Sequence, residues 1–142
     1  MIKLSSALQL SIMTEAEKAY PDECCGIILG KLEFDGSKSA ESLITVDNAR
    51  ENSQRYHRFE ITAEDIKDAE QKARKQGKDL IAFYHSHPDH PAVPSDYDRE
   101  HALPFYSYII VSVEKGKAIQ LTSWELTEDR IEFRKEEVKN GG

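Results

Sequence analysis

The chain has 142 residues, the usual size of one domain, with 19 basic and 26 acidic residues and a formal net charge of −7. The acidic balance argues against binding nucleic acid through a basic face. Its two cysteines are neighbours, so a disulfide scaffold is excluded, and no run approaches the roughly 18 apolar residues of a membrane span. We therefore expect a cytoplasmic protein that binds neither nucleic acid nor membrane.

The first half of the chain is predicted to hold a helix followed by a strand hairpin. Apolar residues recur at helical spacing over 5–20, with Ser5 as the N-cap and Pro21 as the stop. The apolar run ECCGIILG is typical of a buried strand. Further along we expect a turn at Asp35-Gly36, a strand over 42–47, a loop over 48–58 and a short strand over 56–61.

The second half is predicted to begin with a helix and continue mainly as strands. Thr62 and Asp65 form a capping-box variant, and Gly77 is a good residue to follow the last turn. The strand LIAFYH runs directly into HSHP, and three prolines make 88–94 a loop. The remaining predicted elements are a short helix from Ser95 to before Pro104, a strand over 106–113, and two strands over 118–126 and 130–136 that complete an antiparallel meander.

These elements predict an α+β fold made of one domain over 1–142. We expect a mixed, mostly antiparallel sheet flanked by two main helices, with a short helix after HSHP. Residues 137–142 are predicted to form a flexible tail.

The residues suited to chemistry lie in one segment. His85 and His87 are two apart at the end of a strand, so both imidazoles point to one face. A proline loop then turns the chain back, and Ser95 and Asp98 lie three apart on one face of the next helix. Two histidines and one aspartate make a three-ligand set with an open fourth position, which is typical of catalytic zinc.

Two further residues are predicted to serve this site. Glu23 lies at the mouth of an apolar strand and is the best general base for water activated by zinc. The Ser95 hydroxyl, placed by its helix terminus, is suited to donate to a developing oxyanion. Each residue also has an ordinary interpretation, because Ser95 and Asp98 are typical helix-capping residues and Glu23 is equally well a solvated carboxylate at a strand start.

At these positions the chain resembles the JAMM, or MPN-plus, zinc metalloproteases. The run from His85 to Asp98 matches H-[S/T]-H-P-x(6)-S-x(2)-D at every position, and Glu23 lies after the first helix, as the family glutamate does. The resemblance implies that His85, His87 and Asp98 bind one zinc ion, that Glu23 is the general acid/base, and that Ser95 stabilises the oxyanion.

The resemblance also implies an activity and a partner. Members of this family cleave amide or isopeptide bonds after ubiquitin-like proteins that end in Gly-Gly. The compact chain and its Cys-Cys-Gly run look like small bacterial members that act on sulfur-carrier proteins, so we expect a carrier-processing peptidase. One alternative is a catalytically silent MPN-type scaffold, and another is a zinc hydrolase of small amides. A deaminase would be expected to carry His-x-Glu and Pro-Cys-x-x-Cys, which are absent from the sequence.

A few residues suggest other roles. Cys25 shares a strand face with Glu23, but a cysteine in an apolar strand is more commonly a small core residue. A cysteine protease that used Cys24 or Cys25 as its nucleophile would leave Asp98 unexplained. His90 and His101 flank the motif and are suited to guide substrate or to lie on the surface. The basic-aromatic cluster at 55–58 is a possible docking face for an acidic carrier or a solvated loop, and the terminal Gly141-Gly142 resembles the tails that the family handles.

Overall fold

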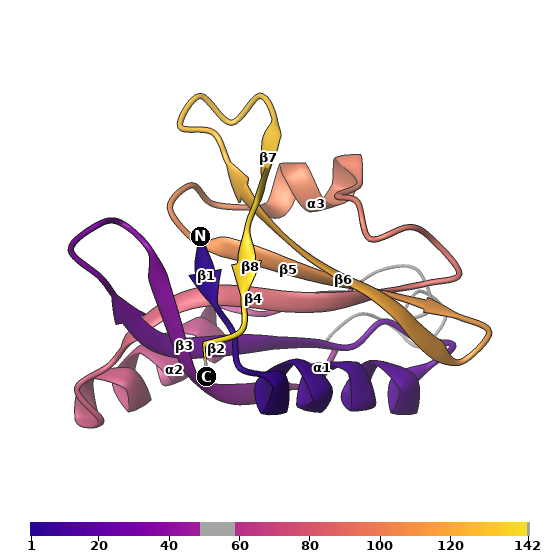
Figure 1. The fold of residues 1–142 in the computed structure, drawn as a ribbon, viewed down its shortest axis with the longest axis horizontal. Coiled ribbons are helices and arrows are strands. Elements are labelled where there is room, and N and C mark those ends of the chain that lie inside the picture. Colours follow the sequence, from indigo (N-terminus) through magenta and orange to yellow (C-terminus); the bar gives the residue numbers. More distant parts are fainter. Residues whose placement is uncertain (49–58, 142) are drawn as a thin grey trace.

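The computed structural model describes residues 1–48 and 59–141. Within these residues, three helices surround one sheet (Figure 1). The order along the chain is β1 (Ile2–Lys3), α1 (Ser6–Ala19), β2 (Cys25–Leu32), β3 (Lys38–Val46), α2 (Ala63–Lys75), β4 (Asp79–Pro88), α3 (Asp96–His101), β5 (Ser107–Glu114), β6 (Lys117–Leu126), β7 (Phe133–Glu136) and β8 (Val138–Lys139).

The sheet is mixed and mostly antiparallel, as predicted. In the described part of the chain its eight strands lie in the order β7-β6-β5-β4-β2-β3-β1-β8. β4 pairs in parallel with β5, and β1 pairs in parallel with both β3 and β8. The hairpin of β2 and β3, and the meander from β5 to β7, are antiparallel. The strand that ends in HSHP is therefore central, with neighbours on both sides.

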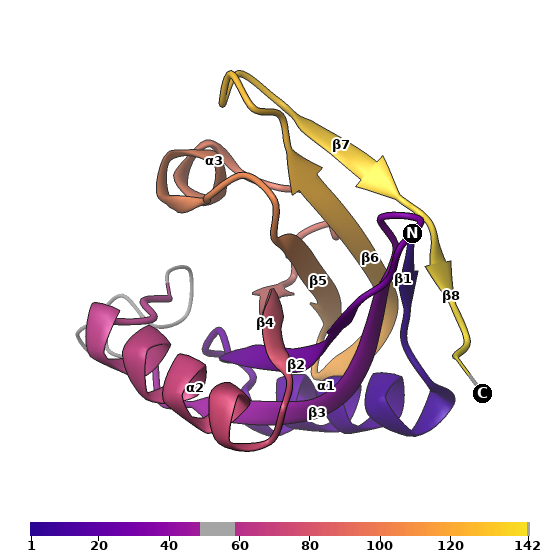
Figure 2. The ribbon, with the colours of Figure 1, turned by 90° about the vertical axis from the view of Figure 1, so that its left-hand side faces the viewer.

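The sheet is strongly curved, and its two edge strands, β7 and β8, follow one another in the chain. β7 and β8 are separated only by Glu137, yet they pair with opposite edges of the strand order. In Figure 2 the chain runs from β7 beside β6 to β8 beside β1. The buried Lys38 shows the same curvature, because from β3 its Nζ donates to Ser107 Oγ on β5 and Glu125 Oε2 on β6, both at 2.9 Å.

Two apolar clusters cover opposite faces of the sheet, each beneath one main helix. Alternate residues of a strand point to opposite faces, so Tyr84 of β4 packs with Ile12 and Ala16 of α1. Phe83 instead packs with Ala69 and other residues beneath α2. From Phe83 onward, the odd-numbered positions of β4, which include His85 and His87, therefore face the side of the sheet that carries α2.

The helix termini confirm the sequence predictions. The Ser5 hydroxyl accepts from Leu8 N–H at 3.2 Å, so Ser5 caps α1. Both halves of the predicted capping box are present at α2, where Asp65 N–H donates to Thr62 Oγ1 at 3.1 Å and Thr62 N–H donates to Asp65 Oδ2 at 2.9 Å. Gly77, just beyond α2, has a φ of +67°, which suits glycine.

Three predictions near the ends of elements were wrong. Within 56–61, the part at 59–61 is not a strand, because the N–H of Glu60 donates to the side chain of Asn48; residues 56–58 lie outside the described residues. β7 begins only at Phe133, because a turn held by Asp129 precedes it. The predicted flexible tail contains β8 at Val138–Lys139, held by pairing with β1.

Across 1–48 and 59–141, the helices are too short or too polar to cross a membrane.

Candidate metal centre

Two buried histidines lie side by side on β4. His85 is 1% exposed and His87 is 8% exposed. Because they are two residues apart on a strand, their side chains share one face, as predicted. Their Nε2 atoms lie 3.1 Å apart, so both rings aim the same nitrogen at a common point.

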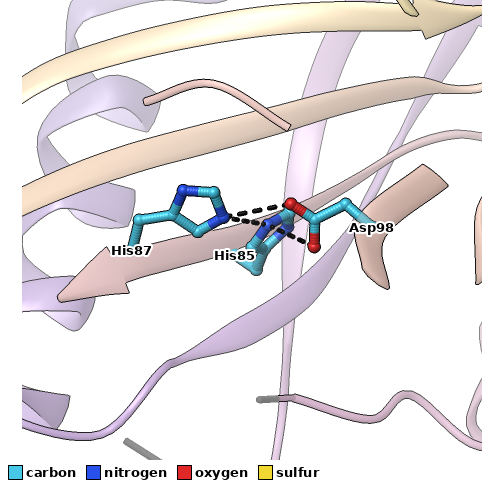
Figure 3. A group of neighbouring side chains, drawn as sticks. All are labelled: His85, His87 and Asp98. Carbon is cyan, nitrogen blue, oxygen red and sulfur yellow. Dashed lines mark hydrogen bonds and ion pairs between the residues drawn. The ribbon is translucent and has the colours of Figure 1, made fainter. Parts of the chain in front are cut away.

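Asp98 is brought to the same point by α3. Ser95 caps this helix, and a capping box joins it to Asp98: the N–H of Asp98 donates to Ser95 Oγ at 3.1 Å, and the N–H of Ser95 donates to Asp98 Oδ2 at 2.9 Å. Asp98 Oδ2 lies 3.0 Å from His87 Nε2, and Oδ1 lies 3.3 Å from His85 Nε2. Figure 3 shows the three side chains converging, two from the strand and one from the helix.

The spacing of these atoms suits a small tetrahedral metal ion. Ligand atoms about 2.0–2.1 Å from zinc in tetrahedral geometry are separated by roughly 3.3 Å. The two Nε2 atoms lie 3.1 Å apart, and each lies 3.0 or 3.3 Å from one of the two Asp98 oxygens, so these separations lie close to that value. In the described part of the chain, these three residues form the one cluster of at least three His, Cys, Asp or Glu side chains with ligand atoms within 4.8 Å of one another.

The electrostatics of the group also favour a cation. Burial lowers the pKa of His85, which favours its neutral imidazole, although Asp98 acts in the opposite direction. Burial also opposes protonation of His87, but Asp98, the Pro91 carbonyl and Glu23 outweigh it and raise the pKa of His87. Although burial alone would raise the pKa of Asp98, the two histidines hold it well below its ordinary value. An ionised carboxylate facing two ring nitrogens is therefore suited to hold a positive charge between them.

The outer nitrogens of the two rings differ in their surroundings. His87 Nδ1 donates to the Pro91 carbonyl at 2.9 Å. A metal-bound histidine commonly makes this kind of hydrogen bond with its other ring nitrogen. His85 Nδ1 is buried and has no hydrogen-bond partner among residues 1–48 and 59–141. Its ring instead stacks on Phe59, with centroids 4.2 Å apart, so packing rather than a hydrogen bond orients His85.

Phe59 was not anticipated from the sequence. It lies in the irregular segment before α2, where no periodicity marks an aromatic residue as functional. The Tyr97 hydroxyl of α3 donates to the Phe59 carbonyl at 2.9 Å, and the two rings meet edge to face at 6.4 Å. The helix that carries Asp98 therefore also holds the aromatic ring against His85.

Glu23 lies next to the histidines, just before β2. Cys25 of β2 pairs with His85 of β4. Two hydrogen bonds join the neighbouring residues Cys24 and Ser86: the N–H of Ser86 donates to the Cys24 carbonyl at 3.1 Å, and the N–H of Cys24 donates to Ser86 Oγ at 2.9 Å. Continuing this antiparallel register sets Glu23 opposite His87 and on the same face. Glu23 is 7% exposed, and its charge contributes to the raised pKa of His87.

Ser95 lies at the exposed start of α3. Its Oγ accepts the N–H of Asp98, which uses an oxygen lone pair and leaves the hydroxyl hydrogen able to donate to a ligand. The capping and donating roles that the sequence suggested for Ser95 are therefore chemically compatible.

The two cysteines are core residues. Cys24 and Cys25 are 6% and 0% exposed. Burial raises the pKa of Cys24 to about 12 and raises that of Cys25 further. A thiol with such a raised pKa is almost entirely protonated near neutral pH and is a poor nucleophile. This disfavours a cysteine protease, and it accords with the small-core interpretation.

A small apolar pocket adjoins the centre. Its volume is about 130 Å³, and His85 and Asp98 form part of its wall. Most of its other lining residues are apolar or aromatic and include Phe59, Ile66, Phe83, Leu103 and Tyr108. Space of this size suits one side chain rather than a folded domain.

Other residues singled out in the sequence have varied positions. His101 lines this pocket and stacks on Tyr97 at 4.1 Å. His90 is exposed, and its carbonyl accepts from Ser112 Oγ at 2.6 Å. The basic-aromatic cluster at 55–58 and Gly142 lie outside the described residues.

A family model and a curated relative assign this chain to the same kind of protein. The family model described as "Prokaryotic homologs of the JAB domain" matches residues 5–127. A desampylase of Haloferax volcanii is 31% identical over 138 residues, covering 94% of this chain and 91% of the relative.

Solved structures agree with this assignment. The solution structure of a protein from Salinibacter ruber is 40% identical, with a TM-score of 0.76, and covers 96% of this chain and 90% of that one. A protein from Desulfitobacterium hafniense is 28% identical, with a TM-score of 0.82 and coverage of 97% and 91%. A JAB1/MPN domain protein from Archaeoglobus fulgidus shares the fold, with a TM-score of 0.59 at 19% identity and coverage of 98% and 95%. The resemblance to JAMM-type proteins is confirmed, and the chain belongs to the family of prokaryotic homologues of the JAB domain.

Proposed function

We propose that this protein is a zinc-dependent isopeptidase that hydrolyses the amide bond after the C-terminal Gly of a ubiquitin-like protein of the sulfur-carrier type. The observation that carries the proposal is the convergence of His85, His87 and Asp98 on one buried point. The desampylase relative supports the class of activity. Three protein ligands leave one tetrahedral position for water or substrate, as catalytic zinc sites require.

The proposed mechanism assigns one task to each residue. His85, His87 and Asp98 would hold one zinc ion per chain, and zinc, when bound, supplies the Lewis acidity that activates water toward a carbonyl. Glu23 accepts a proton from the attacking water on its carboxylate and then donates it to the leaving nitrogen. Ser95 donates its hydroxyl hydrogen to the carbonyl oxygen as negative charge develops there. The C–N bond breaks, and the products are a carrier carboxylate and an amine.

The sheltered position of Glu23 supports its assignment. Glu23 is 7% exposed, and continuing the strand register sets this residue opposite His87, which supports a role for its carboxylate beside the proposed ligands. Limited solvent contact also favours a proton relay that stays within the site, because bulk water competes less for the proton.

The test is cleavage of defined conjugates. Carrier proteins ending in Gly-Gly and joined to an amine through the terminal Gly are incubated with the zinc-loaded protein, and the products are followed by intact mass. We expect release of the free carrier, and loss of that release on adding a chelator. The Glu23→Gln variant is the matched control, because it removes the base without removing a proposed ligand.

Three outcomes would contradict the proposal. Absence of cleavage across a broad panel of carriers, despite bound zinc, would favour a scaffold that binds partners without hydrolysing them. Cleavage confined to small amides would favour the hydrolase alternative. Zinc-independent cleavage would contradict the assigned chemistry.

A further inference from the structure

The loop between β4 and α3 is held by side chains at three successive carbonyl groups. Ser112 Oγ on β5 donates to the His90 carbonyl at 2.6 Å. His87 Nδ1 donates to the Pro91 carbonyl at 2.9 Å. Thr122 Oγ1 on β6 donates to the Ala92 carbonyl at 2.7 Å. The carbonyl groups held by the two hydroxyl groups therefore lie on either side of the Pro91 carbonyl, which contacts His87.

The direction of the Thr122 hydrogen bond is determined by a third partner. Trp124 Nε1 lies 2.8 Å from Thr122 Oγ1, and an indole N–H only donates. The Thr122 oxygen accepts from Trp124, so its hydrogen is directed to the Ala92 carbonyl. Thr122 is 5% exposed and Ser112 is 3% exposed. Water therefore competes little for either hydroxyl group, and loss of either would leave a carbonyl of the loop without this donor.

The held carbonyl determines which nitrogen of His87 faces the metal centre. Because a carbonyl oxygen only accepts, His87 Nδ1 must carry a hydrogen, and Nε2 is the nitrogen directed toward His85 and Asp98. If the Pro91 carbonyl moved away, the hydrogen could shift to Nε2 or the ring could rotate. A hydrogen on Nε2 would occupy the lone pair that a metal needs.

We propose that Ser112 and Thr122 are positioning residues: they anchor the loop so that the Pro91 carbonyl holds His87 with its metal-binding nitrogen turned toward Asp98. The inference rests on the proposed function for its link to metal, but the anchoring itself is a property of the loop. Neither residue is a proposed ligand or touches the reacting atoms. Both act through the backbone of residues 90–92.

The experiment compares matched hydroxyl variants of the full chain. Thr122→Val keeps the size of the side chain and removes the donor, whereas Thr122→Ser retains the donor. Ser112→Ala removes the second anchor. Ser123→Ala is the control, because Ser123 is a buried hydroxyl on the same strand that donates to Glu136 Oε1 at 2.7 Å, away from the loop.

Two readouts separate positioning from simple loss of stability. Zinc affinity, measured by competition with a chelator, should fall about tenfold or more in Thr122→Val and Ser112→Ala, as expected when support around a metal ligand is lost. Thr122→Ser should restore it, and Ser123→Ala should match wild type. In ¹⁵N-edited spectra, the His87 Nδ1 hydrogen should be sheltered from water exchange in wild type and lost or broadened in Thr122→Val.

The outcomes distinguish this proposal from the proposed function. Wild-type zinc affinity and an unchanged His87 Nδ1 signal in both Thr122→Val and Ser112→Ala would overturn the positioning role. The nitrogen-bound hydrogen is also observed without metal, so this readout remains valid if the protein cleaves no conjugate. Should Thr122→Val fail to fold, Ser112→Ala removes the other anchor of the loop and carries the test by itself, with the same expected changes and the same refuting result.

Discussion

Gly26 lies directly across from Tyr84 in the pairing of β2 with β4, and the absence of a side chain there makes room for the aromatic ring. A Cβ atom at this position would overlap the Cζ, Oη and Cε1 atoms of Tyr84. Carbon atoms in favourable contact are about 3.5–4.0 Å apart. Tyr84 is fully buried, and its hydroxyl donates to Glu15 Oε2 at 2.6 Å. Gly26→Ala would therefore force a packed ring away from a charged hydrogen-bond partner.

The structure indicates the size of this effect. Overpacking a core typically costs about 1–3 kcal/mol, and a hydrogen bond to a charged group contributes about 1.5–3 kcal/mol. We expect Gly26→Ala to lower the free energy of unfolding by about 3–5 kcal/mol. At about 4 °C for each kcal/mol, the melting temperature would fall by roughly 12–20 °C.

Urea denaturation of a double-mutant cycle tests the cause as well as the magnitude. Gly26→Ala is measured in wild type and in Tyr84→Ala, where the ring is absent. In the second background the alanine should be nearly neutral, or slightly favourable because glycine is a poor strand residue. An equal cost in both backgrounds would refute the proposed collision, as would a cost below about 1 kcal/mol in wild type.

Three further predictions concern the metal centre. His87→Ala should lose the single bound zinc measured by elemental analysis, and full retention of zinc would exclude the proposed ligand set. Glu23→Gln should keep zinc and lose about 10²–10⁴-fold in turnover, so unchanged turnover would remove its role as base. In the metal-free protein, burial opposes protonation of His87, but its partners outweigh burial and raise its pKa. Protonated His87 therefore stabilises the fold, and this contribution is fully present below the ordinary histidine pKa of about 6.5. The contribution is lost as the pH rises through the raised pKa. The urea midpoint of metal-free wild type should therefore fall from pH 6 to pH 9 by more than that of Asp98→Asn, and equal falls would contradict the pairing.

The sequence alone predicted the elements whose determinants are local. The capping box of Thr62 and Asp65 depends on residues three apart, and the β2–β3 turn depends on Asp35 and Gly36. The proposed ligands were predictable for a similar reason. His85 and His87 share a strand face by period, and the capping residue Ser95 places Asp98 on the first turn of the following helix.

Only the tertiary structure showed which distant segments support the site. β1 and β8 are two residues each, too short for any periodic pattern, and pairing alone makes them strands. Phe59 stacks on His85 from an irregular segment, and Thr122 reaches the loop from β6. Such contacts depend on how a curled sheet brings strands together, because hydrogen bonds and ring packing between distant residues leave no spacing in the sequence. The sequence alone therefore determined the proposed ligand set, whereas the packing of β5, β6 and the segment before α2 decided how those ligands are held.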